Sequence, residues 1–234
     1  MNETVKREME HFLGANSEQS AKFQRYLELL KKYNEVMDLT AITAEDEIWE
    51  KHFWDSISLG RFVDFTGKSL IDVGTGAGFP GLPLKIAHPS LRVTLLDALS
   101  KRVGFLEEVC HTLSLTDISA VHGRAEEYAK LPDVRESFDF ATSRALARLN
   151  MLCELALPFV KVGGQFLAMK AEGAEEEIKE AENAIALLGG KIVAEHSYTL
   201  PITNVTRRVI VIEKIHATPE KYPRRFARIQ KKPL

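Results

Sequence analysis

Cysteine is scarce in this sequence, with two residues in a chain of 234. Cys110 and Cys153 lie in apolar stretches that we expect to be helical, without a CxxC pair or further metal ligands nearby. Structural zinc sites need several such ligands at short spacings, and disulfide frameworks need many paired cysteines. The sequence therefore predicts no metal site and a reducing, cytoplasmic compartment.

Long apolar runs are also missing. No segment approaches the roughly 20 apolar residues that a membrane-spanning helix needs. The N-terminal stretch MNETVKREMEHF is charged and lacks the apolar centre of an export signal. Hydrophobic residues still make up 45% of the chain, which is enough for one good-sized domain with a buried core. We therefore expect neither export nor contact with a membrane.

Charge is spread unevenly along the chain. The formal net charge is −2, but TPEKYPRRFARIQKKPL at 218–234 holds six basic residues and one acid. A basic, aromatic-containing tail on an acidic body is typical of proteins that contact a polyanion. A solvated, disordered terminus has the same composition. We expect a flexible basic tail and leave both interpretations open.

The rest of the chain divides into a helical first part and an alternating second part. Residues 17–37 show helical spacing of apolar side chains after Ser17, a candidate N-cap. TAED at 43–46 resembles a capping box before a further helix. We therefore assign residues 1–66 to an N-terminal helical cap, 67–217 to an α/β domain and 218–234 to the basic tail.

From residue 68 onward, strand-like runs alternate with helical stretches. The expected strands are SLIDV, RVTLLDA, ISAVHGRA, FDFATSRA, GGQFLAMK, KIVAEHSYTL and RRVIVIEKI. This alternation predicts a seven-stranded, mostly parallel sheet with helices on both faces. Only a short link joins the last two strands, which predicts a hairpin and hence one antiparallel strand.

A glycine-rich loop follows the first of these strands, in LIDVGTGAGFPGLP. Such a strand, loop and helix unit places backbone N–H groups at the carboxyl edge of the sheet, where open α/β folds bind ligands. Gly76, Gly78 and Gly81 satisfy the dinucleotide pattern GxGxxG, but they begin two residues too late for the turn. A nicotinamide-dependent reductase is therefore one alternative.

Counted from the strand end, the pattern is Asp72 followed by Gly74, Gly76 and Gly78. A carboxylate at that position would repel a pyrophosphate but would accept an ammonium group or order the loop. S-adenosylmethionine carries an ammonium group, and its carboxylate suits a helix N-terminus. The loop therefore favours a methyl donor over a dinucleotide.

Two further acids follow strand ends. Asp97 ends RVTLLD, where an acid typically binds a ribose diol, although it would also cap the next helix. Ala125 and Glu126 follow the third expected strand, where methyltransferases commonly contact adenine, although a helix N-terminus also attracts an acid. Three successive strand ends with Asp72, Asp97 and Glu126 predict a nucleoside-containing cofactor.

At this point the chain resembles the GidB or RsmG family of bacterial methyltransferases. The resemblance lies in DVGTGAGFPGLPLKI, KHFWDS, GRAEE, SRALARL and TPEKYPRR, and it spans nearly the whole chain. It implies a class I, Rossmann-like methyltransferase fold and methyl transfer from S-adenosylmethionine to guanine N7 in the decoding region of 16S rRNA. The implied cofactor contacts are Gly74, Phe79, Asp97, Ala125, Glu126 and Arg144.

The sequence around the fourth strand end agrees with an N7 acceptor. Methylation of base amino groups usually uses an Asn/Asp-Pro-Pro-aromatic motif, which is missing here. Methylation of a pyrimidine carbon needs a cysteine nucleophile, whereas we expect Cys153 in the core. Guanine N7 has a free lone pair and no proton to lose, so alignment suffices. We predict no catalytic base and take Arg144 as the residue that contacts O6 or a phosphate, or braces the cofactor.

Other polar residues invite functional interpretations. His52, Asp55 and Ser56 form no hydrolase triad, because they share one helical turn and no serine elbow is present. Arg144 and Arg148 are expected on one helical face, with Tyr222 and Phe226 available to stack on bases. The candidate RNA contacts are Arg144, Arg148, Lys170, Arg207, Arg208, Arg224 and Arg225. A catalytically silent RNA-binding module is the alternative from another class.

Overall fold

A single mixed sheet forms the centre of the protein in a computed structural model that describes residues 2–144 and 146–234. Within these residues, seven strands lie in the order β3-β2-β1-β4-β5-β7-β6. They are β1 (Ser69–Val73), β2 (Arg92–Asp97), β3 (Ile118–His122), β4 (Phe138–Arg144), β5 (Val160–Ala171), β6 (Gly190–Thr199) and β7 (Thr206–Lys214). Only β7 runs antiparallel to its neighbours β5 and β6. The predicted α/β sheet with one antiparallel strand is confirmed.

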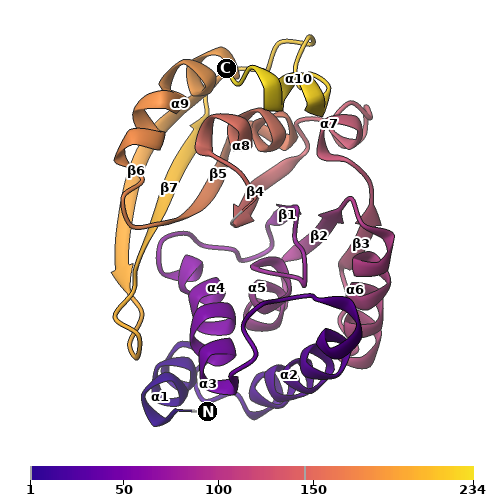
Figure 1. The fold of residues 1–234 in the computed structure, drawn as a ribbon, viewed down its shortest axis with the longest axis vertical. Coiled ribbons are helices and arrows are strands. Elements are labelled where there is room, and N and C mark those ends of the chain that lie inside the picture. Colours follow the sequence, from indigo (N-terminus) through magenta and orange to yellow (C-terminus); the bar gives the residue numbers. More distant parts are fainter. Residues whose placement is uncertain (1, 145) are drawn as a thin grey trace.

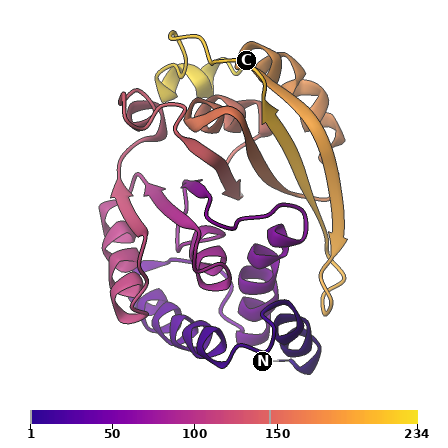
Figure 2. The same ribbon diagram turned by 180° about the vertical axis from the view of Figure 1, so that it is seen from behind.

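Helices cover both faces of the sheet (Figure 1). One layer holds α7 (Ala125–Tyr128), α8 (Leu149–Ala156), α9 (Glu175–Leu187) and α10 (Phe226–Lys231), with the short 3-10 helix η3 (Leu157–Phe159) after α8. The other holds α4 (Asp55–Ile57), α5 (Gly81–Ala87) and α6 (Ser100–Thr112), with α1 (Glu3–Phe12), α2 (Ser17–Met37) and α3 (Glu45–Ile48) outside it. Seen from behind, the β6–β7 hairpin reaches past the sheet toward α1 (Figure 2). No helix in the described part of the chain is long and apolar enough to cross a membrane.

The N-terminal helices pack directly on the sheet layer. Tyr26 of α2, Phe53 and Phe79 are buried in one hydrophobic cluster with Leu95 of β2. The ring centroids of Tyr26 and Phe79 lie 5.6 Å apart, and the Tyr26 hydroxyl donates a hydrogen bond to the Ala77 carbonyl of the glycine loop. The N-terminal cap therefore packs against the glycine loop and helps to hold it in place. The division of the chain at residues 66 and 217 stays a prediction.

Details of the cap differ from the sequence expectation. Asn16, not Ser17, is the N-cap of α2, because its side chain accepts from the N–H groups of Glu18 and Gln19. Ala44 precedes α3 without a side-chain cap, so TAED forms no capping box. The expected helix runs without interruption from Glu45 to Arg61, but its type changes along the way, from α3 to the π-helix η1 (Trp49–Trp54), α4 and the 3-10 helix η2 (Ser58–Arg61). A π-helical turn redirects side chains and often marks a functional site.

The C-terminal segment packs on the body, against the expectation of a flexible tail. Tyr222 is 6% exposed and Ile229 is fully buried. Arg224 forms hydrogen bonds of 2.8 and 2.6 Å with the two carboxylate oxygens of Glu154, a fully buried acid of α8. A buried carboxylate needs such a partner, because its desolvation is costly. The basic composition of the segment thus includes a structural charge.

Candidate functional site

Asp72 organises the glycine loop at the end of β1. Its Oδ2 accepts hydrogen bonds from Thr75 Oγ1 at 2.6 Å and from the Gly81 N–H at 2.8 Å. Gly74 and Gly78 adopt φ angles of 70° and 103°, which side chains rarely allow. Burial raises the pKa of Asp72 to about 6. The carboxylate therefore orders the loop, which was one of its two expected roles.

One oxygen of the same carboxylate remains free among the described residues. Asp72 Oδ1 is buried and has no hydrogen-bond partner there. Buried polar atoms are normally paired, so an unpaired acceptor beside a glycine loop suits a ligand donor such as an ammonium group. This atom is the first sign that the loop fits S-adenosylmethionine.

Asp97 joins the ends of β1 and β2. Its Oδ2 accepts from the Gly76 N–H and its Oδ1 from the Leu99 N–H, both at 2.9 Å. Arg102 Nη1 lies 3.6 Å from Oδ2. The side chain is nearly buried but borders a cavity, so lone pairs of both oxygens are still available to a diol.

A cavity of about 190 Å³ lies over these strand ends. It is lined by the predicted cofactor residues Gly74, Asp97, Ala125 and Glu126. The remaining lining is Val73, Leu96, Ala98, Leu99, Arg102, Gly123, Arg124, Leu146, Leu155 and Phe226. The Glu126 carboxylate has no hydrogen-bond partner among the described residues, although the residue is only 6% exposed. Largely apolar walls with two acids and two arginines suit an adenosine, and we call this cavity the adenosine pocket.

The structure places Phe79 and Arg144 away from the adenosine pocket. Phe79 stacks on His52, with ring centroids 4.4 Å apart and planes 15° from parallel. The Arg144 guanidinium carbon lies 5.0 Å from the centroid of the Phe79 ring. Both residues thus border the π-helix of the cap, and a contact of either with the cofactor stays a prediction.

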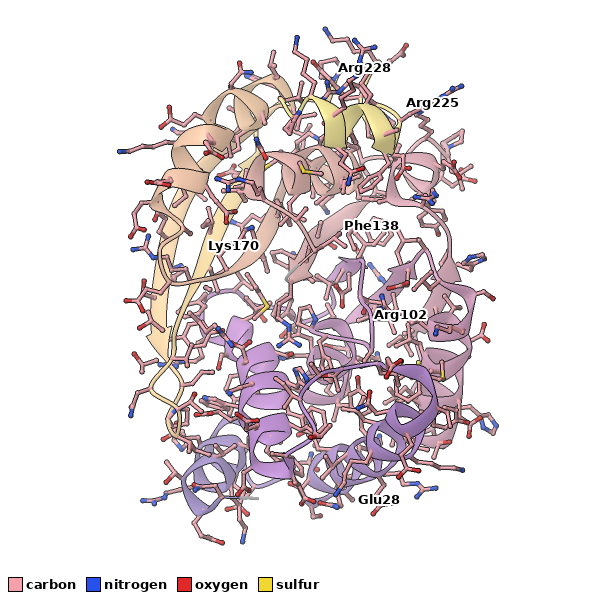
Figure 3. The ribbon with its side chains drawn as sticks, viewed as in Figure 1. Glu28, Arg102, Phe138, Lys170, Arg225 and Arg228 are labelled. Atoms are coloured by element: carbon pink, nitrogen blue, oxygen red, sulfur yellow. The ribbon has the colours of Figure 1, made fainter. Side chains whose placement is uncertain are left out.

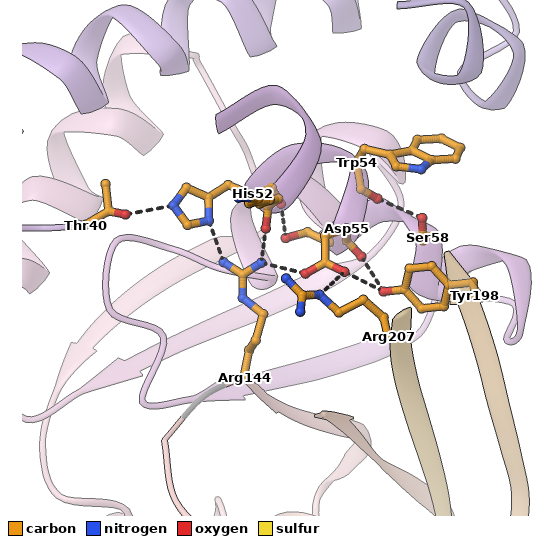
Figure 4. A network of polar contacts seen from close by, with 10 residues as sticks. Thr40, His52, Trp54, Asp55, Ser58, Arg144, Tyr198 and Arg207 are labelled. Atoms are coloured by element: carbon orange, nitrogen blue, oxygen red, sulfur yellow. Dashed lines mark hydrogen bonds and ion pairs between the residues drawn. The ribbon is translucent and has the colours of Figure 1, made fainter. Parts of the chain in front are cut away.

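Arg144, at the end of β4, is held by three groups of the cap (Figure 4). Its Nη1 donates to the Lys51 carbonyl at 2.8 Å and to Asp55 Oδ2 at 3.1 Å. Its Nη2 lies 3.1 Å from His52 Nδ1. The guanidinium is thereby fixed in position and orientation.

His52 is a neutral link in this network. Arginine only donates, so His52 Nδ1 must accept, and Nε2 then donates to Thr40 Oγ1 at 2.8 Å. Burial, followed by the nearby charge of Arg144, lowers the pKa of His52 to about 3. Ser56 Oγ donates to the His52 carbonyl and is itself buried. The rejection of a triad is confirmed in this arrangement.

Asp55 connects Arg144 to the last hairpin. The residue is 1% exposed, and its Oδ1 accepts from the Tyr198 hydroxyl at 2.7 Å. Arg207 Nε lies 3.3 Å from the same oxygen. Two arginines thus share one buried carboxylate.

A second cavity, of about 400 Å³, opens beside this network. Its lining includes five cationic residues, Lys51, Arg144, Lys170, Arg207 and Arg208. The other lining residues are Ile42, His52, Asp55, Met169, Ala171, Glu177 and Tyr198. Four of the predicted RNA contacts therefore meet here, and we call it the basic pocket.

The remaining RNA candidates lie elsewhere. Arg148 is the N-cap of α8 and pairs with Glu180, so it does not share a helical face with Arg144, which ends β4. Arg224 is occupied by Glu154. Arg225 is exposed at the start of α10. Their contacts with RNA stay predictions.

Several residues of the site were not expected from the sequence. Thr40 and Tyr198 gave no motif, and Leu146 and Phe226 line the adenosine pocket from distant parts of the chain. Asp55 was noticed but assigned no chemistry. An acid inside the aromatic run HFWDS was the available signal, because a buried acid implies buried cationic partners.

Comparison with known proteins decides among the open alternatives. A family model described as rRNA small subunit methyltransferase G matches residues 19–206. The chain belongs to this family. A protein named ribosomal RNA small subunit methyltransferase G from Alkaliphilus metalliredigens is 51% identical over 89% of this chain and 88% of its own. A protein of the same name from Geobacillus thermodenitrificans is 48% identical over 96% of this chain and 95% of its own.

Solved structures show the same fold at low identity. M. jannaschii TYW2 in complex with AdoMet has a TM-score of 0.58 at 14% identity, covering 76% of this chain and 81% of its own. A SAM dependent methyltransferase from Aquifex aeolicus has a TM-score of 0.55 at 16% identity, covering 75% and 97%. The predicted family, the methyltransferase fold, and methyl transfer from S-adenosylmethionine to small-subunit rRNA are confirmed. The nicotinamide reductase is excluded.

Proposed function

We propose that this methyltransferase acts in the bacterial cytoplasm on a guanine N7 in the decoding region of 16S rRNA, free or within the small ribosomal subunit. The observation that supports the choice of N7 is that the acids and the imidazole lining the basic pocket are already engaged, Glu177 by Lys170 Nζ at 2.6 Å and by the Leu149 N–H at 3.0 Å. His52 has both ring nitrogens occupied and a pKa of about 3. Asp55 is shared by two arginines, and burial raises the pKa of Tyr198 far above its usual value.

Nucleophilic cysteines are also lacking at the site. Cys153 is fully buried in α8, and burial raises the pKa of its thiol well above the usual range. Burial likewise raises the pKa of Cys110, on α6, to about 11. The site therefore lacks the groups that assist acceptors which lose a proton or form a covalent adduct, whereas guanine N7 requires neither step.

The cofactor and the guanine would be bound by different residues. Asp97 would hold the ribose diol, Ala125 and Glu126 the adenine, and Asp72 Oδ1 with the loop N–H groups the methionine end of the cofactor. When bound, S-adenosylmethionine supplies the electrophilic methyl group. Arg144 would position the guanine through O6 or an adjoining phosphate, because a bidentate contact that includes N7 would block the reacting atom.

The basic pocket would receive the RNA strand. Lys170 and Arg208 line it while paired with Glu177 and Glu175, so their charges are partly compensated in the free protein. Phosphates would compete for these cations and release counterions, which makes binding salt-dependent. Arg148, Arg224 and Arg225 lie outside the pocket and are weaker proposals.

The proposal is tested by labelling. Methyl-labelled S-adenosylmethionine is incubated with small-subunit RNA, free and as intact subunits, from cells that lack this protein. Digestion should release labelled 7-methylguanosine, and the better substrate shows when the enzyme acts. Label in another nucleoside contradicts the choice of N7, and RNA binding without label supports the silent binding module.

A further inference from the structure

The C-terminal segment reaches the adenosine pocket. Phe226, the first residue of α10, lines that cavity together with Leu155 of α8. Phe226 is half-buried and packs against the cluster on this face of the sheet. The family model matches residues 19–206, so this wall lies outside the matched range.

Several contacts fix the segment in this place. The Arg135 guanidinium donates to the carbonyls of Tyr222 at 2.9 Å and Thr218 at 2.8 Å. Glu154 Oε1 accepts from both the backbone N–H of Arg224 at 2.9 Å and its Nε at 2.8 Å. Glu154 and Leu155 are neighbours in α8, so the anchor lies next to the pocket wall. A segment held by buried polar contacts presents Phe226 at little entropic cost.

We propose that Phe226 is a cofactor-binding residue that covers the adenine of S-adenosylmethionine, and that residues 218–234 form a wall of the adenosine pocket. This inference rests on the proposed function, since it assigns a further contact to the same cofactor. The adenine ring is flat and apolar on its faces, and an aromatic side chain offers both contact area and exclusion of water.

The burial of the aromatic side chains and the exposure of the basic ones in this segment favour a role in the adenosine pocket over stacking on RNA bases. Tyr222 is 6% exposed, so it is not available to stack on a base as the sequence suggested. Arg225 and Arg228 are exposed and point away from the body at the end of the molecule where α10 lies (Figure 3). The aromatic side of α10 thus faces the pocket while its basic side faces solvent.

Binding of S-adenosylhomocysteine and of adenosine by titration calorimetry tests the proposal on the full chain. Phe226→Ala should weaken the binding of both ligands by about tenfold, or about 1.4 kcal/mol, because it removes the stacking of the adenine on an aromatic ring. Phe226→Leu keeps most of the packing and should lose less, about threefold, which covers the case that the alanine variant folds poorly. Equal factors for the two ligands place the contact at the adenosine end.

Phe138→Ala is the matched control. Phe138 packs at the edge of the same cluster, with its ring centroid 6.3 Å from that of Phe159, and lines neither pocket. The Phe138→Ala substitution should lower the melting temperature without changing the affinity for S-adenosylhomocysteine or for adenosine. Wild-type affinity in both Phe226 variants overturns the proposal and leaves the proposed function intact, whereas failure of the wild type to bind S-adenosylhomocysteine overturns both.

Discussion

The Tyr198 hydroxyl donates to Asp55 Oδ1 at 2.7 Å, while Asp55 Oδ2 accepts from Arg144 at 3.1 Å. One carboxylate therefore connects the last hairpin, the cap and the end of β4. These three elements line the basic pocket, so this buried acid helps to hold the pocket's shape.

Asp55→Asn should destabilise the protein and disable the enzyme. The substitution removes the negative charge between Arg144 and Arg207, and breaking a buried pair from one side typically costs about 3–5 kcal/mol. Urea denaturation measures the change. Glu180→Gln, which breaks the exposed pair with Arg148, is the control and should leave the unfolding midpoint nearly unchanged. Equal midpoints for the two variants would contradict this account of Asp55.

Asp97→Asn should weaken S-adenosylhomocysteine binding by about 10- to 100-fold, because hydrogen bonds to a charged group contribute roughly 1.5–3 kcal/mol. The amide retains the size of the side chain but has only one acceptor oxygen for Gly76, Leu99 and the ribose. Calorimetric titration measures the effect. An unchanged dissociation constant would remove Asp97 from the cofactor site.

Because Asp72 titrates at a raised pKa in the folded chain, the free energy of unfolding should decrease as the pH rises. Its pKa is about 6 in the folded chain against an ordinary 3.8, so between these values the folded state keeps a proton that the unfolded state has lost. The free energy of unfolding then decreases through this window by about 3 kcal/mol. Denaturation of wild type and Asp72→Asn from pH 4 to 7 isolates the contribution, since other groups cancel. Parallel profiles for the two proteins would show that Asp72 titrates normally.

Arg208→Gln should reduce RNA affinity in a salt-dependent way. If Arg208 neutralises one phosphate, the slope of log affinity against log salt should become shallower by about 0.7–0.9. Binding to a decoding-region RNA fragment at several salt concentrations gives the slope. Arg25→Gln, on the exposed face of α2, is the control and should keep the wild-type slope. Identical slopes for all three proteins would place the RNA elsewhere.

Local sequence patterns predicted the parts of the site that local sequence builds. The strand ends carrying Asp72, Asp97 and Glu126 follow from apolar runs and glycine spacing. The ends of β1, β2 and β3 line one cavity, as expected. The network around Arg144 did not follow, because its partners lie far away in the sequence: Asp55 is 89 residues from Arg144 and 143 from Tyr198. No periodicity brings such residues together.

The tail was misread for a related reason. Its basic composition suggested that the segment lies in solvent or contacts RNA, but Arg224 pairs with the buried Glu154. The one signal was that acid itself, placed inside the apolar stretch MLCELAL. A carboxylate among core residues requires a cation from elsewhere, and the sequence does not say which of many cations supplies it.

The central claim is that methyl transfer here needs alignment and no base, and a pH–rate profile tests it most directly. Single-turnover methylation of saturating small subunits would be followed between pH 7 and 9. The account predicts a constant rate for the wild type and a profile of the same shape for His52→Gln, since His52 stays neutral throughout. A rate that rises about tenfold per pH unit would reveal an essential deprotonation and contradict it.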